Sequence, residues 1–167
     1  MEQDRNQTPR ANRIHIGFFG RRNAGKSSLI NAVTGQQVSV VSDILGTTTD
    51  TVEKAMELLP IGPVVLIDTP GLDDSGALGE LRVQRAKQTF SHTDIAVLVV
   101  DASVGMTQDD RRILQALTEK HIPALSVWNK WDLAENTVLP EGAIAVSAAT
   151  GDGIEALKER LGAFYRE

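Results

Sequence analysis

The chain has 167 residues, of which 41% are hydrophobic and 23% charged, and its formal net charge is −5. This composition is typical of a soluble globular domain. The negative balance argues against a surface built throughout for nucleic acid and leaves room only for a local basic patch. The sequence contains no cysteine, so it can form neither disulfides nor thiolate metal sites. That fits a reducing compartment, and we expect a cytoplasmic location.

The N-terminal segment differs in character from the rest of the chain. Residues 1–12, MEQDRNQTPRAN, are polar throughout and lack the apolar core of a signal peptide. We expect this segment to be a flexible tail and residues 13–167 to form one domain. No apolar run in the sequence approaches the roughly 20 residues that a membrane span needs. We therefore expect no membrane partner.

In the first part of the domain, the sequence predicts a strand, a helix and a hairpin. Residues 13–20, RIHIGFFG, form a short apolar run that ends in glycine, which is typical of a buried strand. Residues 26–35 then predict a helix that ends at Gly35. Two further runs, 51–60 and 64–70, flank the turn sequence PIGP and predict a hairpin.

In the second part, predicted strands alternate with predicted helices. We expect strands at 94–101, 122–130 and 142–148, and helices at 81–90, at 107–120 and from Asp152 onward. Thr107 and Asp110 have the spacing of a capping box, and the apolar run at 94–101 is typical of a strand buried on both faces. This alternation predicts an α/β fold with a mostly parallel sheet covered on both faces. Ligands bind such sheets at the carboxyl ends of the strands.

The stretch GRRNAGKSS, which begins at Gly20, matches the phosphate-binding pattern of two spaced glycines followed by lysine and a hydroxyl residue. Glycine lets backbone N–H groups converge on phosphate oxygens, and the following helix adds its N-terminal dipole. A glycine turn with a solvated lysine is the alternative, but the pattern lies between a predicted strand and a predicted helix. The residues predicted to bind the phosphates are Ala24, Gly25, Lys26, Ser27 and Ser28, with Lys26 on the β- and γ-phosphates and Ser27 on Mg²⁺.

Two later stretches complete the predicted phosphate and magnesium site. In DTPG, Asp68 ends a strand and is expected to hold Mg²⁺ through its water shell, while the N–H of Gly71 faces the γ-phosphate. In GTTTD, Thr48 is expected to bind Mg²⁺ only when γ-phosphate is present, with Thr47 as the second choice. The alternatives are an ordinary turn for the first stretch and a solvated loop for the second.

The stretch NKWD at 129–132 indicates which base the site reads. A carboxylate at Asp132 would accept two N–H bonds from the Watson–Crick edge of guanine, and adenine has no such pair of donors. Asn129 and Lys130 are expected to brace the loop and to pack over the base. The later stretch Ser147, Ala148 and Ala149 is expected to offer a backbone N–H to the guanine O6. The predicted ligands are therefore GTP and GDP.

With these motifs in this order, nearly everything after residue 13 resembles a GTPase of the translation-factor-related class, in the group that contains Era, TrmE and EngA. The resemblance implies a three-layer P-loop GTPase fold with a six-stranded sheet of order 2-3-1-4-5-6 and one antiparallel edge strand. It also implies Mg²⁺-dependent GTP hydrolysis and a homodimer through the GTPase domains. In the TrmE-like members, an asparagine at the position of Asn23 helps to bind K⁺, together with carbonyls of a loop here at 42–46. The alternative is that Asn23 only turns the loop.

The residue that orients the attacking water is not evident from the motifs. Ras-type enzymes have a glutamine where Leu72 stands here. Glu80 resembles the distant catalytic glutamate of the TrmE group, and Asp73 and Asp74 compete with it, while all three also fit solvated loop carboxylates. The catalytic set predicted from the sequence is Lys26, Thr48, Gly71 and Glu80.

Within that group, three segments most resemble the GTPase domain of HydF, the maturation protein of iron–iron hydrogenases. They are residues 20–36, 40–50 and 60–82. HydF proteins carry a dimerisation domain and a cysteine-containing cluster-binding domain after the GTPase domain, so the resemblance implies a domain excised from a longer protein. It further implies those domains, hydrogenase and the other maturation proteins as partners, and no direct contact with nucleic acid. The alternative is a nucleotide-dependent switch of the Era, TrmE and EngA group, related to ribosomes or tRNA, with slow incidental hydrolysis.

Overall fold

The computed structural model describes residues 13–21, 24–35, 52–58, 61–68, 79–134 and 136–166. Within these ranges, six strands form one sheet of order β2-β3-β1-β4-β5-β6, in which every neighbouring pair is parallel except β2 with β3. The sheet order and its single antiparallel pair confirm the predicted fold class. The strands are β1 (Ile14–Gly20), β2 (Val52–Leu58), β3 (Gly62–Asp68), β4 (Ile95–Asp101), β5 (Ala124–Asn129) and β6 (Ile144–Ala145).

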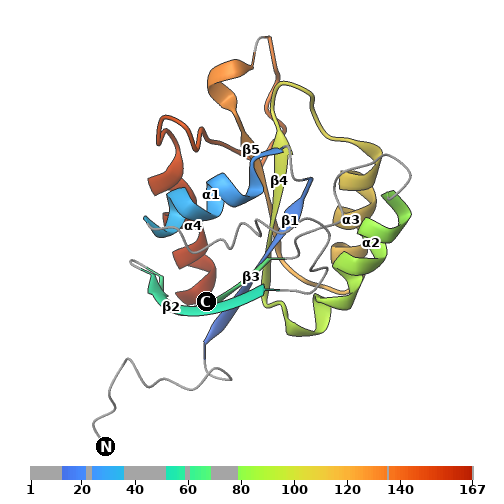
Figure 1. Ribbon diagram of the computed structural model, residues 1–167, viewed down its shortest axis with the longest axis vertical. Helices are drawn as coiled ribbons and strands as arrows, with labels where there is room; N and C mark the ends of the chain where they lie inside the picture. The colour runs from blue at the N-terminus through green and yellow to red at the C-terminus, as the bar shows by residue number, and fades with distance from the viewer. Residues whose placement is uncertain are drawn as a thin grey trace, which may run out of the picture.

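Helices cover both faces of this sheet, with α1 and α4 on one side and α2 and α3 on the other (Figure 1). None of the helices in the described ranges is long and apolar enough to cross a membrane. Two short 3-10 turns, η5 and η6, interrupt the connections. The bounds are α1 (Lys26–Thr34), α2 (Gly79–Gln88), η5 (Phe90–His92), α3 (Gln108–Glu119), η6 (Trp131–Leu133) and α4 (Ile154–Arg166).

Strand β4 shows how the two helical layers are attached to the sheet. From Ile95 to Val100 the side chains are buried and alternate in direction. Odd-numbered residues join the apolar cluster of α1 and α4, and even-numbered residues join the cluster of α2 and α3. Because each buried aliphatic side chain contributes about 1.5–3 kcal/mol, the strand stabilises both layers at once. This confirms the reading of 94–101 as a strand buried on both faces.

Several predicted element ends are confirmed by local geometry. Gly35 is left-handed, with φ 74°, and its N–H donates to Asn31 at 2.8 Å, which ends α1. At the start of α3, Thr107 and Asp110 form the predicted capping box, each side chain accepting from the other residue's N–H. The predicted hairpin is the antiparallel pair β2 and β3, and its register brings Leu58 opposite Gly62.

Several boundaries differ from the prediction, and three of them have an evident local cause. Helix α4 begins at Ile154 and not at Asp152, because Gly153 has φ 81° and cannot belong to a right-handed helix. Helix α2 ends at Gln88, because the N–H of Thr89 bonds to the carbonyl of Ala86 in a tighter turn. Strand β6 is only two residues long, because the chain turns away beyond Val146.

Candidate nucleotide-binding site

The carboxyl ends of β1, β3, β4, β5 and β6 lie at the same edge of the sheet, the upper edge in Figure 1. The predicted motifs follow or end these strands. The glycine-rich loop follows β1, Asp68 ends β3, Asn129 ends β5, and Ser147 comes shortly after β6. In open α/β sheets this edge is where ligands bind. The fold therefore brings motifs from residue 20 to residue 147 of the sequence to one place.

The start of α1 is arranged to receive an anion. Gly25 caps the helix in a left-handed conformation, with φ 88°, and as a glycine it supplies no side-chain cap to the N–H groups of the first turn. The N–H groups and the dipole at a helix N-terminus together favour negative charge. Within this turn Ser27 is half-buried and Ser28 is exposed. The predicted phosphate-binding residues from Ala24 to Ser28 thus lie where phosphate oxygens would find donors.

Lys26 and Asp68 form an ion pair at the base of this turn. The Lys26 Nζ lies 3.1 Å from the Asp68 Oδ1, and the two residues are only 3% and 8% exposed. Apart from this ion pair, Asp68 Oδ1 is buried and accepts no hydrogen bond from the described residues. An anionic oxygen left in this condition beside a phosphate-binding turn suits a hard cation that prefers oxygen ligands. The donor set therefore fits Mg²⁺.

Asn129 connects the phosphate-binding loop to the loop after β6. Its side-chain amide donates to the carbonyl of Ala24 at 2.9 Å, and its Oδ1 accepts the N–H of Ala148 at 3.0 Å. Asn129 is only 2% exposed, so both bonds are shielded from water. A Cβ added to Gly25 would collide with this amide, which gives Gly25 a second reason to be glycine.

Asp132 is held by a neighbouring hydroxyl. It lies in η6 and is exposed, and the Ser147 hydroxyl donates to its Oδ1 at 2.7 Å. Ser147 itself is 1% exposed and is fixed by backbone bonds with Asp152 and Gly151. The structure thus places a partly oriented carboxylate next to the loop that Asn129 ties to the phosphate-binding turn.

Lys130 has a backbone conformation that non-glycine residues rarely adopt. Its φ is 64°, and its Nζ lies 3.3 Å from the Asp101 Oδ2 at the end of β4. Ser103 donates to the other oxygen of Asp101 from its N–H at 2.9 Å and from its hydroxyl at 2.6 Å. Burial raises the pKa of the Asp101 carboxyl, but the bonds from Ser103 and the charge of Lys130 outweigh burial and hold the pKa below its usual value. Asp101 and Ser103 belong to none of the sequence motifs, because only the pairing of β4 with β5 brings them to Lys130.

Arg21 links the phosphate-binding loop to the start of α3. Its Nε is buried and has no hydrogen-bond partner within the described residues. Its charge acts on Asp110, the buried carboxylate of the capping box. Burial raises the pKa of Asp110, and the hydrogen bonds from Thr107 and the charge of Arg21 only partly oppose that rise. The ionised carboxylate is therefore costly, and the positive charge at Arg21 reduces that cost.

Several predicted site residues lie outside the described part of the chain. They are Asn23, Thr47, Thr48, Gly71, Leu72, Asp73, Asp74 and the loop at 42–46. Glu80 belongs to the first turn of α2 by its backbone, and its side chain is outside the description. The roles predicted for all of these residues remain predictions.

The sequence matches a known family of GTPases. Residues 15–130 match the model of a protein family described as 50S ribosome-binding GTPase. The chain belongs to this GTPase family. Among curated proteins, the tRNA modification GTPase MnmE of Nitrosomonas europaea is 40% identical over 156 residues, which are 89% of this chain and 34% of the relative. MnmE of Aquifex aeolicus is 38% identical over 154 residues, with the same coverage. This GTPase thus spans about a third of the length of these relatives.

Solved structures of GTPases have the same fold. A variant of Era from Aquifex aeolicus bound to GDP and AlF4⁻ superimposes with a TM-score of 0.71 at 26% identity, covering 90% of this chain and 56% of Era. A probable GTP-binding protein EngB superimposes with a TM-score of 0.69 at 28% identity, covering 91% of this chain and 98% of EngB. Together with the family match, they place this GTPase domain in the group that contains TrmE and Era.

Proposed function

We propose that the domain binds GTP at the carboxyl edge of the sheet and hydrolyses it to GDP and phosphate, as the nucleotide-driven module of a larger protein. The observation that carries this proposal is the double hydrogen bond of Asn129. It joins the phosphate-binding loop to the loop after β6, so that the segments for the two ends of a guanine nucleotide form one unit.

The phosphate end is assigned to the first turn of α1. The N–H groups from Gly25 to Ser28 would donate to phosphate oxygens, and Lys26 would neutralise charge on the β- and γ-phosphates. Ser27, Asp68 and, with GTP, Thr48 are the residues proposed to hold Mg²⁺. When bound, Mg²⁺ would stabilise the negative charge that develops on the phosphate oxygens. The N–H of Gly71 would face the γ-phosphate, and Glu80 is the proposed residue for orienting the attacking water.

The base end is assigned to Asp132. The hydrogen bond from the Ser147 hydroxyl orients this exposed carboxylate, so that it can accept the two N–H groups of the guanine edge. The N–H of Ala148 donates to Asn129. The guanine O6 would therefore either compete with the Asn129 Oδ1 for the N–H of Ala148 or accept the N–H of Ala149. A base held in this way would lie beside the side chain of Lys130.

Activity with different monovalent ions tests both hydrolysis and the proposed K⁺ site at Asn23. We expect faster GTP turnover in KCl than in NaCl at matched ionic strength with excess Mg²⁺, because the smaller Na⁺ fits a site built for K⁺ poorly. Asn23→Ala should remove the difference and leave GDP affinity nearly unchanged. Initial rates of phosphate release measure both effects.

The outcomes of that assay test the K⁺ site and GTP hydrolysis separately. Turnover that is equal in the two salts would contradict the K⁺ site and return Asn23 to the role of a turn residue. Absence of GTP turnover in both salts, repeated in the full-length protein, would contradict hydrolysis itself. A homodimer formed in K⁺ with GDP and aluminium fluoride would support pairing through the GTPase domains.

The cellular role has two candidates. The names of the curated relatives favour a role in tRNA modification or a related switch function of the Era and TrmE group. The resemblance of residues 20–36, 40–50 and 60–82 to HydF favours hydrogenase maturation, with hydrogenase and other maturation proteins as partners.

Deleting the gene for the full-length protein would distinguish the two roles. Loss of hydrogenase activity with unchanged tRNA modification would support maturation. The reverse result would support the tRNA-related role and overturn the other. Complementation with the Lys26→Ala variant then shows whether the affected process needs nucleotide binding.

A further inference from the structure

The Lys130 side chain lies between two structural elements. Lys130 directly follows β5 and has a backbone φ of 64°. Its Nζ lies 3.3 Å from the Asp101 Oδ2 at the end of β4. A Cβ placed on Gly25 would lie 3.9 Å from the Lys130 Cε, so the aliphatic stem runs beside the phosphate-binding turn. The ammonium group is thus held at β4 while the stem stays near the start of α1.

The Asp101 carboxylate is itself held firmly. One oxygen accepts both the N–H and the hydroxyl of Ser103, and the other faces Lys130. The strand end is also tied to β5, because the N–H of Ala102 donates to the carbonyl of Asn129 at 2.8 Å. With its side chain 16% exposed, Asp101 offers Lys130 a charged anchor that moves little.

We propose that Asp101, supported by Ser103, is a positioning residue for nucleotide binding, which holds the Lys130 stem extended over the place of the guanine. This inference rests on the proposed function, because it assumes that Asp132 reads a base beside Lys130. An unanchored lysine would sample many rotamers, and ordering it would then cost part of the binding free energy. Asp101 removes that cost before the nucleotide arrives.

The test compares Asp101→Asn, Lys130→Met and the double variant in titrations with GDP and GTP. The asparagine keeps an acceptor for Ser103 and loses the charge, and the methionine keeps an apolar stem and loses the ammonium group. We expect Asp101→Asn to lower the affinities for GDP and GTP equally, by about three- to thirty-fold, the range typical of residues coupled in one ion-pair network. In the Lys130→Met background the same change should have almost no effect.

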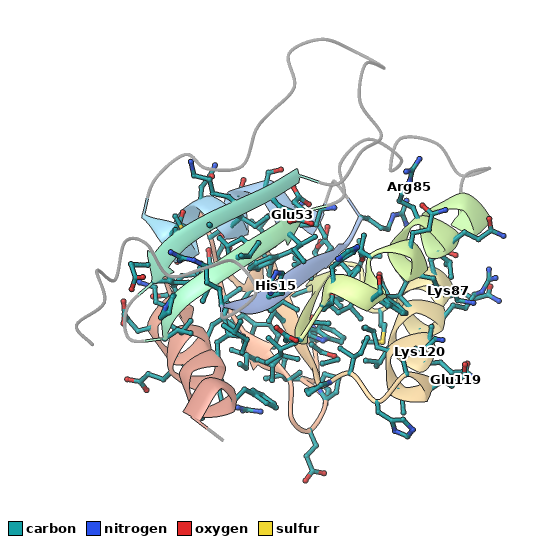
Figure 2. All side chains as sticks on the ribbon, turned by 90° about the horizontal axis from the view of Figure 1, so that it is seen from below. His15, Glu53, Arg85, Lys87, Glu119 and Lys120 are labelled. Atoms are coloured by element: carbon teal, nitrogen blue, oxygen red, sulfur yellow. The ribbon has the colours of Figure 1, made fainter. Side chains whose placement is uncertain are left out.

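Asp94→Asn provides a matched control. Asp94 precedes the opposite end of the same strand and accepts the N–H of His15 at 2.8 Å, far from the proposed site (His15 is labelled in Figure 2). This control should bind both nucleotides as the wild-type protein does. If Asp101→Asn fails to fold in urea-unfolding measurements, Ser103→Ala replaces it with the same criterion, since it loosens Asp101 and keeps its charge.

The outcomes separate this inference from the proposed function. Wild-type affinity in Asp101→Asn, or an equal loss with and without Lys130, would overturn the positioning role and leave GTP binding intact. A wild-type protein that binds no guanine nucleotide would overturn both. A loss that disappears in the Lys130→Met background would establish that Asp101 acts through Lys130.

Discussion

Replacing Asp132 with asparagine is expected to change the nucleotide that the domain prefers from GTP to xanthosine triphosphate. The carboxylate accepts two N–H groups of guanine. The asparagine keeps one oxygen that can still accept one of them, but its NH₂ group faces the other N–H and cannot accept it. Losing one hydrogen bond to a charged group, at about 1.5–3 kcal/mol, weakens GTP binding by roughly 10–10²-fold. Xanthine has a carbonyl in place of the exocyclic amine, and the new NH₂ group can donate to it. Titrations of both nucleotides measure the change.

A second variant shows whether the effect comes from the base contact. Ser147→Ala removes the hydroxyl that orients Asp132 at 2.7 Å. It should weaken GTP by a smaller factor and give no gain for xanthosine triphosphate, because the carboxylate is still present. Unchanged GTP affinity in Asp132→Asn would remove Asp132 from the guanine site.

Several elements of the fold follow from local sequence patterns. The apolar run of β4, the turn between β2 and β3, and the capping box of Thr107 each depend on neighbouring residues, so the sequence alone predicts them. The start of α4 depends on a glycine conformation, φ 81° at Gly153, which a helical pattern does not reveal. The short β6 depends on tertiary hydrogen bonds near Val146, and these are equally hidden from the sequence.

The candidate site divides in a similar way. Motif spacing predicts that Lys26, Asp68 and Asn129 meet at one edge, because parallel strands place their carboxyl ends together. It does not predict which side chains bond to one another. The bond from Asn129 to Ala24 joins residues 105 apart, and the pair of Lys130 with Asp101 depends on the register between β4 and β5. These contacts are properties of the assembled sheet.

Phosphate binding and magnesium binding are expected to fail separately when Lys26 and Thr48 are changed. Lys26→Ala should weaken the binding of both GDP and GTP, by roughly 10–100-fold, because the lost contact is a charged hydrogen bond that includes the β-phosphate. Thr48→Ala should leave GDP binding unchanged and weaken GTP only in the presence of Mg²⁺, because its ligand role requires the γ-phosphate. Titrations of both nucleotides with and without Mg²⁺ separate the two patterns.

Stability must be measured alongside affinity, because Lys26 also neutralises Asp68. The two are buried, and removing one partner of a buried pair can cost about 3–5 kcal/mol of folding stability. Urea unfolding without nucleotide shows whether Lys26→Ala remains folded under the binding conditions.

Lys158→Ala on α4 and the exposed Thr118→Ala on α3 repeat the same substitutions away from the site, and neither should alter affinity. Equal losses of GDP and GTP in Thr48→Ala would contradict its role as a γ-phosphate-dependent ligand. Thr47→Ala would then be the next variant to titrate, since Thr47 is the other hydroxyl predicted to bind Mg²⁺ in that run.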